Sequence, residues 1–271
     1  MKQIVGSREY KVKLKKKRFI GPKAVLLREA GFFWAAFSKA IKDIAIDTVG
    51  DLDEVTKRRK IRFYDTKDHR LRKNSYVFRE RIDLVSKKRK VTLKFRHPDR
   101  YISQDRDMDA AEKGKGKPKF EEDIKLPFKK LYSYSNKQTI SSRKSLNRLK
   151  APGELFPDLK RRLDYYWEDE PITVVGCFTA REIVIEGAKF RIGNNPAVEA
   201  ECALIAWYDK KKSKNKPVVV EFSFKYKNKE EEYDGDAAQK AYDIFSLFQG
   251  ALKKWVDSKG PTKTAYVYSR A

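Results

Sequence analysis

Residues 60–97 read KIRFYDTKDHRLRKNSYVFRERIDLVSKKRKVTLKFRH. Basic side chains recur in this stretch at every second position, Arg79 with Arg81 and then Lys94 with Arg96. Because successive side chains of a β-strand point to opposite faces, each pair lies on one face of its strand. Unpaired charges are very costly to bury, so this face has to meet water, carboxylates or an anionic ligand. The stretch therefore predicts three successive strands with a cationic face.

The composition indicates an anionic partner. The 271 residues contain 63 Lys and Arg against 38 Asp and Glu, a formal net charge of +25. Such an excess favours a nucleotide, a polyphosphate, a nucleic acid or an anionic lipid surface. A hydrophobic content of 40% is enough to bury a sizeable core, and we expect one domain over residues 1–271.

The first residues and the cysteines bear on the compartment. The opening MKQIVGSREY lacks the continuous apolar region of a signal peptide, and no run of the chain approaches membrane-spanning length. Cys177 and Cys202 both lie beside apolar residues, which favours buried thiols in a reducing compartment over a disulfide. We therefore expect a soluble, cytoplasmic protein without a membrane partner.

The rest of the chain predicts further strands and a few helices. Residues 8–17 alternate as a half-buried strand, with Glu9, Lys11 and Lys13 on its polar face. Further strands are predicted over 120–128, 172–186, 197–208 and 217–227. Apolar residues at helical spacing predict one helix, or two with a break near Gly31, over 23–48, and further helices over 155–167 and 236–256. The last of these is expected to begin at Asp234 or Asp236 and to pack on the sheet.

Charged residues of both signs follow the later strands at a spacing of two. Arg181 lies on one strand, Glu199 and Glu201 on the next, and Glu221 on the last. In an open sheet these faces would lie in water, whereas in a closed barrel of sufficient width they would converge on a lumen that can hold a ligand. Composition and alternation leave both arrangements open.

A resemblance favours the barrel. The turn with Tyr64, Asp65 and Thr66, the strand with Arg79 and Arg81, and the strand with Thr92 and Lys94 resemble, in order and spacing, the motifs of the CYTH family of triphosphate tunnel metalloenzymes. The resemblance is good over residues 9–96 and thinner afterwards. It implies an α+β fold in which a closed antiparallel β-barrel with flanking helices forms a tunnel. It also implies that basic side chains of the tunnel bind a triphosphate, and that Mg²⁺ or Mn²⁺ on carboxylates supports its hydrolysis or cyclisation.

The resemblance assigns roles to individual residues of this chain. Catalysis falls to Glu9, Lys13 and Arg81, with Lys13 in the place of the family's tunnel lysine. The phosphate-binding set comprises Lys11, Arg79, Arg81, Lys94, Arg96 and Arg181. The metal-binding set comprises Glu9, Glu199, Glu201 and Glu221, with one of Glu121, Glu122 or Asp123 as a further ligand. Neither His69 nor His97 is expected to act as a general base.

One position departs from the family's pattern. The family's first strand reads E-x-E-x-K, whereas this chain reads EYKVK and has Lys11 where the second acid stands. An ammonium there repels a divalent cation. The sequence therefore leaves three alternatives: a metal-dependent triphosphatase, with adenylyl-cyclase-type chemistry still open, a tunnel that binds a triphosphate or polyphosphate without catalysis, and a nucleic-acid-binding module. The last is motivated by the net charge and by the interleaved aromatic residues Phe63, Tyr64, Phe78 and Phe95.

Overall fold

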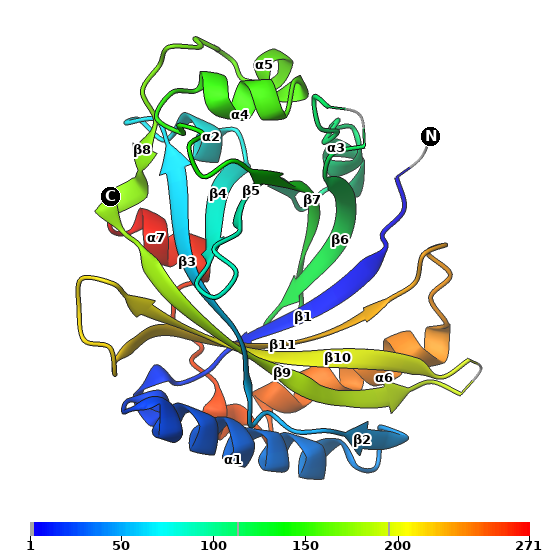
Figure 1. Ribbon diagram of the computed structural model, residues 1–271. Helices are drawn as coiled ribbons and strands as arrows, with labels where there is room; N and C mark the ends of the chain where they lie inside the picture. Colours follow the sequence, from blue (N-terminus) through cyan, green and yellow to red (C-terminus); the bar gives the residue numbers. More distant parts are fainter. Residues whose placement is uncertain (1–2, 113, 195) are drawn as a thin grey trace.

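The computed structural model describes residues 3–112, 114–194 and 196–271 (Figure 1). The strands of this part of the chain are β1 (Ser7–Lys13), β2 (Asp47–Val49), β3 (Val55–Asp65), β4 (Tyr76–Asp83), β5 (Arg89–His97), β6 (Lys117–Lys125), β7 (Lys129–Ile140), β8 (Thr173–Val174), β9 (Ala180–Ile192), β10 (Val198–Asp209) and β11 (Pro217–Lys227). The α-helices are α1 (Lys23–Ile41), α2 (Arg70–Lys73), α3 (Arg100–Gln104), α4 (Lys150–Leu155), α5 (Asp158–Arg162), α6 (Gly235–Ser246) and α7 (Lys263–Tyr268). Short 3-10 turns η1 to η4 lie at Lys16–Phe19, Val175–Cys177, Leu247–Gln249 and Lys253–Trp255.

The sheet closes on itself. Its strands follow the order β9-β10-β11-β1-β6-β7-β5-β4-β3, and β3 pairs again with β9, so that the ladder forms a ring (Figure 1). β2 adds to β9, and β8 adds to β3. Closure leaves the strands of the ring without free edges, which fits the predicted closed barrel and confirms the predicted α+β tunnel fold. The pairings are antiparallel as predicted, except that β1 and β6 are parallel, with Glu9 opposite Asp123.

Most apolar strand faces point outward, and the largest apolar cluster therefore lies outside the ring. α1 and α6 run across the outer face of β9, β10 and β11 (Figure 1). There Phe37 packs against Phe222 and Phe248, with ring centroids 5.0 and 5.8 Å apart. Fully burying an aromatic side chain of this kind stabilises a fold by about 1.5–3 kcal/mol. Because the apolar faces pack outward, the charged faces have only the lumen to point into.

A second cluster covers other strands from outside, and a third, with Phe63 and Trp207, lies on inward strand faces. α2, α4 and α5 lie over β3, β4 and β5 at the far side from α1 (Figure 1). α7 is held beside β3 by Val267 and Tyr268, which pack in a cluster with Phe63 and Trp207. None of the described helices is long and apolar enough to cross a membrane.

The stretch that decides the fold has the predicted form. Residues 60–97 contain most of β3 and all of β4 and β5, which pair in succession. Asp65 accepts hydrogen bonds from the backbone N–H groups of Thr66, Leu71 and Arg72, and Asp68 accepts one from the Thr66 hydroxyl.

Several element boundaries differ from the prediction. The helix predicted over 23–48 runs unbroken through Gly31 and ends at Ile41, where β2 soon follows. The helix predicted over 155–167 is wrong, because only the short α4 and α5 form near it. The helix predicted over 236–256 begins after Asp234, whose side chain accepts from the backbone of Ala237, and ends at Ser246 before two 3-10 turns. β7 and α7 have no counterpart in the prediction.

The two cysteines are free thiols. Cys202 is buried, as predicted, and burial raises its pKa. The prediction of a buried thiol is wrong for Cys177, which is exposed at the end of the η2 turn where the backbone takes a positive φ of 47°.

Candidate functional site

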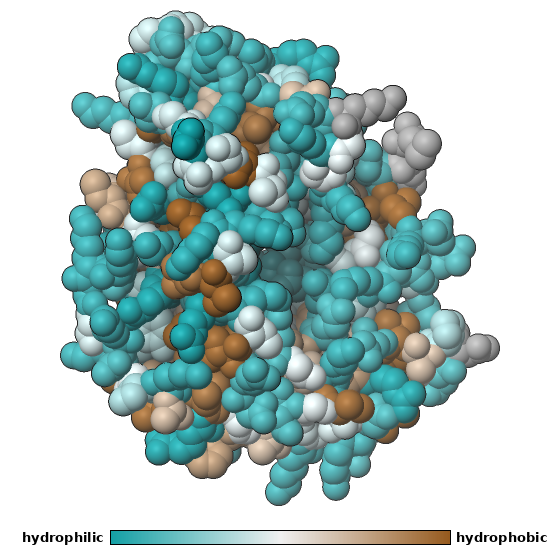
Figure 2. All heavy atoms as spheres, viewed as in Figure 1, coloured by the Kyte–Doolittle hydropathy of each residue, from teal (hydrophilic) through white to brown (hydrophobic). Residues whose placement is uncertain are grey.

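A cavity of about 1140 Å³ lies inside the ring. Figure 2 shows it as a hollow near the centre of the molecule, surrounded mainly by hydrophilic residues. Its charged lining comprises the cations Lys11, Arg79, Arg81, Lys90, Lys94, Arg96, Lys115, Lys117, Lys119, Lys125, Lys137, Lys225, Lys227 and Lys263 and the carboxylates Glu9, Glu121, Asp123 and Glu221. Fourteen cations thus face four carboxylates, and the cavity favours an anion.

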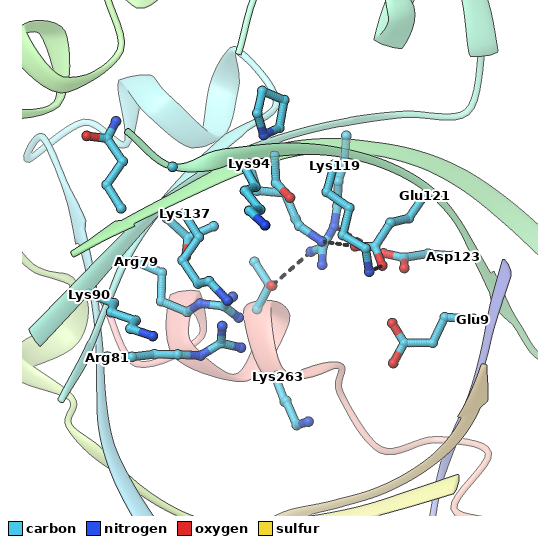
Figure 3. Close-up of a pocket in the computed structure, with 18 of the residues that line it drawn as sticks. Glu9, Arg79, Arg81, Lys90, Lys94, Lys119, Glu121, Asp123, Lys137 and Lys263 are labelled. Carbon is cyan, nitrogen blue, oxygen red and sulfur yellow. Dashed lines mark hydrogen bonds and ion pairs between the residues drawn. The ribbon is translucent and has the colours of Figure 1, made fainter. Parts of the chain in front are cut away.

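One side of the cavity is almost purely cationic. Arg79 and Arg81 of β4 point inward beside Lys90 of β5 and Lys137 of β7 (Figure 3). The Nε atoms of Arg79 and Arg81 are buried and have no hydrogen-bond partner among the described residues. Burial, followed by the neighbouring charge of Arg81, lowers the pKa of Arg79. Each guanidinium carries five N–H donors in a planar fork suited to phosphate oxygens, so these two residues present unused donors to the lumen.

Glu182 is the acid that offsets this charge from within the ring, because its register with Arg59 puts it on the inward face. It lies on β9, is buried, and binds Arg59 Nε at 3.1 Å and Trp207 Nε1 at 2.8 Å. Burial also lowers the pKa of Arg81, although the charge of Glu182 acts in the opposite direction. Its Oε2 accepts from Trp207 and its Oε1 forms the ion pair with Arg59, so the inward Nε donors of Arg79 and Arg81 are left without a partner among the described residues.

The next strand places Lys94 and Arg96 between the cationic side and the carboxylates. Lys94 Nζ lies 3.5 Å from Glu121 Oε2, and Arg96 Nε lies 3.5 Å from Asp123 Oδ2. Burial lowers the pKa of Lys94 to about 8, with the charge of Asp123 in partial opposition. Both pairs are long, which leaves the two cations able to turn toward an anion.

The opposite side of the cavity carries the carboxylates, and each of them is paired with a cation. Lys11 Nζ lies 2.9 Å from Glu9 Oε2 and 2.7 Å from Asp123 Oδ1. Glu121 contacts Lys94 and Lys119. Lys263 Nζ, from α7, lies 2.9 Å from Glu221 Oε1. Burial raises the pKa of Asp123, but Lys11, Lys94 and Arg96 together outweigh it and hold that pKa below its usual range.

The predicted site residues divide into two groups. The structure brings Glu9, Lys11, Arg79, Arg81, Lys94, Arg96 and Glu221 into the lining of one cavity. It does not bring Lys13, Arg181, Glu199 and Glu201 into that lining. Lys13 donates to the backbone carbonyl of Gly260, and Arg181 lies over the ring of Tyr208 at 5.4 Å.

Glu199 and Glu201 lie at the start of β10, close to its connection with β9. Both are exposed. Glu199 binds Lys189 at 2.8 Å, and Glu201 binds Lys227, a residue of the cavity lining, at 2.7 Å. Their spacing of two fixes the face of the strand but not the position along it, and this part of β10 does not reach the cavity lining. Two of the four predicted metal ligands are therefore apart from Glu9 and Glu221.

Several lining residues were not singled out from the sequence. Glu121 and Asp123 are predicted only as alternatives for one metal ligand, but the run FEEDIK could have shown that both share one face of β6 with Lys125, which was missed. Lys137 was missed because β7 has buried polar residues on both faces, among them Ser135 and Asn136. Lys263 has no sequence signal, because α7 reaches the cavity only through tertiary packing.

The carboxylates do not fit a divalent cation. Ca²⁺, Mg²⁺ and Mn²⁺ need several free oxygen ligands, usually including carboxylates. Among the described residues no group of three or more His, Cys, Asp and Glu side chains could hold a metal. The ammonium of Lys11 bridges Glu9 and Asp123, where a cation shared by these two acids would have to lie.

Comparisons with known proteins give structural likenesses only. Neither a protein-family model nor a curated protein matches the chain. A protein from Hippeastrum, proposed to be an adenylyl cyclase and described as having a dominant triphosphatase activity, matches at 12% identity and a TM-score of 0.46, over 98% of this chain and 96% of that one. A Bacillus halodurans protein, also proposed to be an adenylate cyclase, matches at 16% identity and a TM-score of 0.39, over 91% of each chain. A third such protein, from Vibrio parahaemolyticus, matches at 11% identity and a TM-score of 0.38, over 99% of this chain and 100% of that one.

The tunnel is established by the closed ring and its cavity. At such identities and TM-scores the likenesses carry no argument about activity, which has to rest on the side chains of the tunnel.

Proposed function

We propose that the protein binds a triphosphate-containing molecule or a short polyphosphate inside the tunnel. The observation that carries this proposal is the pair Arg79 and Arg81, whose buried Nε atoms have no hydrogen-bond partner among the described residues. Buried charged donors of this kind are costly unless an acceptor completes them. A chain of phosphates carries anionic oxygens at successive positions. Arg79 of β4 and Lys90 and Lys94 of the adjacent strand β5 line the cavity and can each bind such an oxygen.

Nucleic-acid binding through base stacking has less support. The aromatic residues that motivated it, Phe63, Tyr64, Phe78 and Phe95, are all buried, with exposed fractions of 0–7%. Stacking on bases needs an accessible ring face. A 5′-triphosphate end of RNA fits the proposal only as one form of triphosphate.

Metal-dependent hydrolysis, which the resemblance implies, is not part of the proposed function. Its steps need a divalent cation held by carboxylates. Here Glu9 and Asp123 share Lys11, and Glu221 is bound by Lys263.

Calorimetric titration tests the proposal. The ligands are inorganic triphosphate, ATP, 5′-triphosphate RNA, the same RNA with a 5′-hydroxyl end, and orthophosphate. We expect the three triphosphates to bind at least about tenfold more tightly than orthophosphate, since added charge-assisted contacts each contribute about 1.5–3 kcal/mol. Equal affinity for both RNA ends would favour the nucleic-acid module instead. Phosphate release from any triphosphate with Mg²⁺ or Mn²⁺ would restore the hydrolase interpretation.

Binding should weaken at alkaline pH. Burial lowers the pKa of Lys94 to about 8 and that of Lys125 to about 8. A bound anion favours the protonated form, so affinity is complete below pH 8 and falls as the pH rises above the pKa of the free protein. If the protons of Lys94 and Lys125 are both linked to binding, log Kd for triphosphate rises by up to about two for each pH unit above these pKa values. Titrations at pH 7, 8 and 9 measure this slope.

The matched variant is Lys94→Met, which should reduce that slope by about one. Ionisation of the ligand is common to both proteins, so the difference between their slopes isolates Lys94. Identical slopes would show that the ammonium of Lys94 does not contact the bound anion.

A further inference from the structure

Lys11 holds an unusual place between two acids of different strands. The parallel pairing of β1 with β6 puts Glu9 directly opposite Asp123, and Lys11 is two residues further along the same face of β1. Figure 3 shows Glu9 and Asp123 pointing toward the same part of the cavity. The Lys11 ammonium contacts both, at 2.9 and 2.7 Å. It is therefore a cation shared by two carboxylates that belong to different strands.

Asp123 shows that this place is built for a cation. Its side chain is fully buried, and its Oδ2 atom has no hydrogen-bond partner among the described residues. A buried carboxylate in such a position needs positive charge close by. Lys11 supplies it at the shortest distance, and Arg96 approaches Oδ2 to 3.5 Å.

The ammonium of Lys11 is also fixed in its charged form. Burial acts to lower its pKa, but the charges of Asp123 and Glu9 outweigh burial and raise that pKa. A divalent cation could approach the two carboxylates only by displacing a tethered positive charge that repels it.

We propose that the ammonium of Lys11 is a built-in cation that takes the place of a divalent metal between Glu9 and Asp123. The tunnel then binds its anion without Mg²⁺ or Mn²⁺, a consequence that rests on the proposed function. Beside Lys94 and Arg96, Lys11 adds a permanent charge to the wall that the phosphates meet, so that no metal has to be recruited first.

The test is a titration of each protein with Mn²⁺ alone, followed by electron paramagnetic resonance. The proteins are the wild type, Lys11→Glu and Lys90→Glu. The Lys90→Glu variant makes the same change of charge in the cavity lining, away from the two carboxylates. We expect Lys11→Glu, which adds a third carboxylate, to bind Mn²⁺ at least about thirtyfold more tightly than the other two proteins. If the wild type binds Mn²⁺ as tightly as Lys11→Glu, or Lys90→Glu gains as much, the proposal is overturned.

A second variant, Lys11→Met, keeps the test decisive if Lys11→Glu does not fold. Lys11→Met removes the ammonium without adding a carboxylate, and it should still raise the Mn²⁺ affinity severalfold because two acids are freed. Thermal unfolding identifies which variants are folded. No gain of affinity in any folded Lys11 variant would overturn the proposal.

The wild type also has to bind inorganic triphosphate equally well with EDTA and with Mg²⁺, within about threefold on the affinity scale of the titration. A collapse of binding in EDTA would overturn the metal-free tunnel. If the wild type binds no triphosphate in either solution, the proposed function fails, whereas the Mn²⁺ titration still decides whether Lys11 stands in for a metal.

Discussion

Replacing both Arg79 and Arg81 by alanine should lower the affinity for inorganic triphosphate by at least about 100-fold. Hydrogen bonds to charged groups contribute about 1.5–3 kcal/mol each, and the variant removes two guanidinium groups that offer several. The free protein should not lose stability, because the Nε atoms of both residues have no partner in the part of the chain that the structure describes and burial disfavours their charge. Calorimetry measures the first effect, and thermal unfolding measures the second.

The matched control removes the exposed residues Arg58 and Arg143 together. It takes away the same total charge but leaves the tunnel intact, so triphosphate affinity should change by less than about threefold at physiological salt, where exposed charges are screened. Equal losses in the two double variants would mean that overall charge, and not the pair Arg79 and Arg81, binds the anion.

Asp65→Ala should be the most destabilising single change near the tunnel. The buried carboxylate accepts three backbone N–H groups, at 2.9–3.1 Å, and the Tyr268 hydroxyl at 2.7 Å. An unsatisfied buried donor costs about 1–3 kcal/mol, so the loss of the carboxylate should cost about 4 kcal/mol or more. For a protein of this size that lowers the melting temperature by roughly 8–15 °C.

The same variant should weaken triphosphate binding severalfold. Tyr268 anchors α7, and the same helix carries Lys263 and Thr264 in the cavity lining. Tyr268→Phe is the control that removes only one of the four donors, and it should cost about 1 kcal/mol. An unchanged melting temperature in Asp65→Ala would show that water replaces the carboxylate without cost.

The strands could be predicted from the sequence because their chemistry is local. In β1, Tyr10 and Val12 alternate with Glu9 and Lys11, and the structure buries the first pair while the second faces the cavity. The same rule placed Arg79, Arg81 and Lys94 on inward faces. Where both faces are polar and buried, as in β7 with Ser135 and Asn136, hydrophobic alternation vanishes and the strand went unpredicted.

The site could be predicted only in part. A side chain lines the lumen only if it is on the inward face of its strand and also lies at the right position along that strand. Glu199 and Glu201 have the spacing of inward residues but lie at an exposed end of β10. Lys263 reaches Glu221 only because α7 packs into the apolar cluster with Trp207. The bridge from Lys11 to Asp123 depends on the parallel pairing of β1 with β6, which no local pattern signals.

The position of β1 in the ring has a consequence for how the chain folds. β1 lies between β6 and β11, so the ring closes only when one of the earliest segments of the chain meets one of the latest. Contacts between segments so far apart in sequence carry a large loop-closure entropy and form slowly. Until β11 is available, the lysines and arginines of the future lining remain in water, where their mutual repulsion keeps unfinished chains apart. We therefore expect the charge of the cavity lining to oppose aggregation of unfinished chains as well.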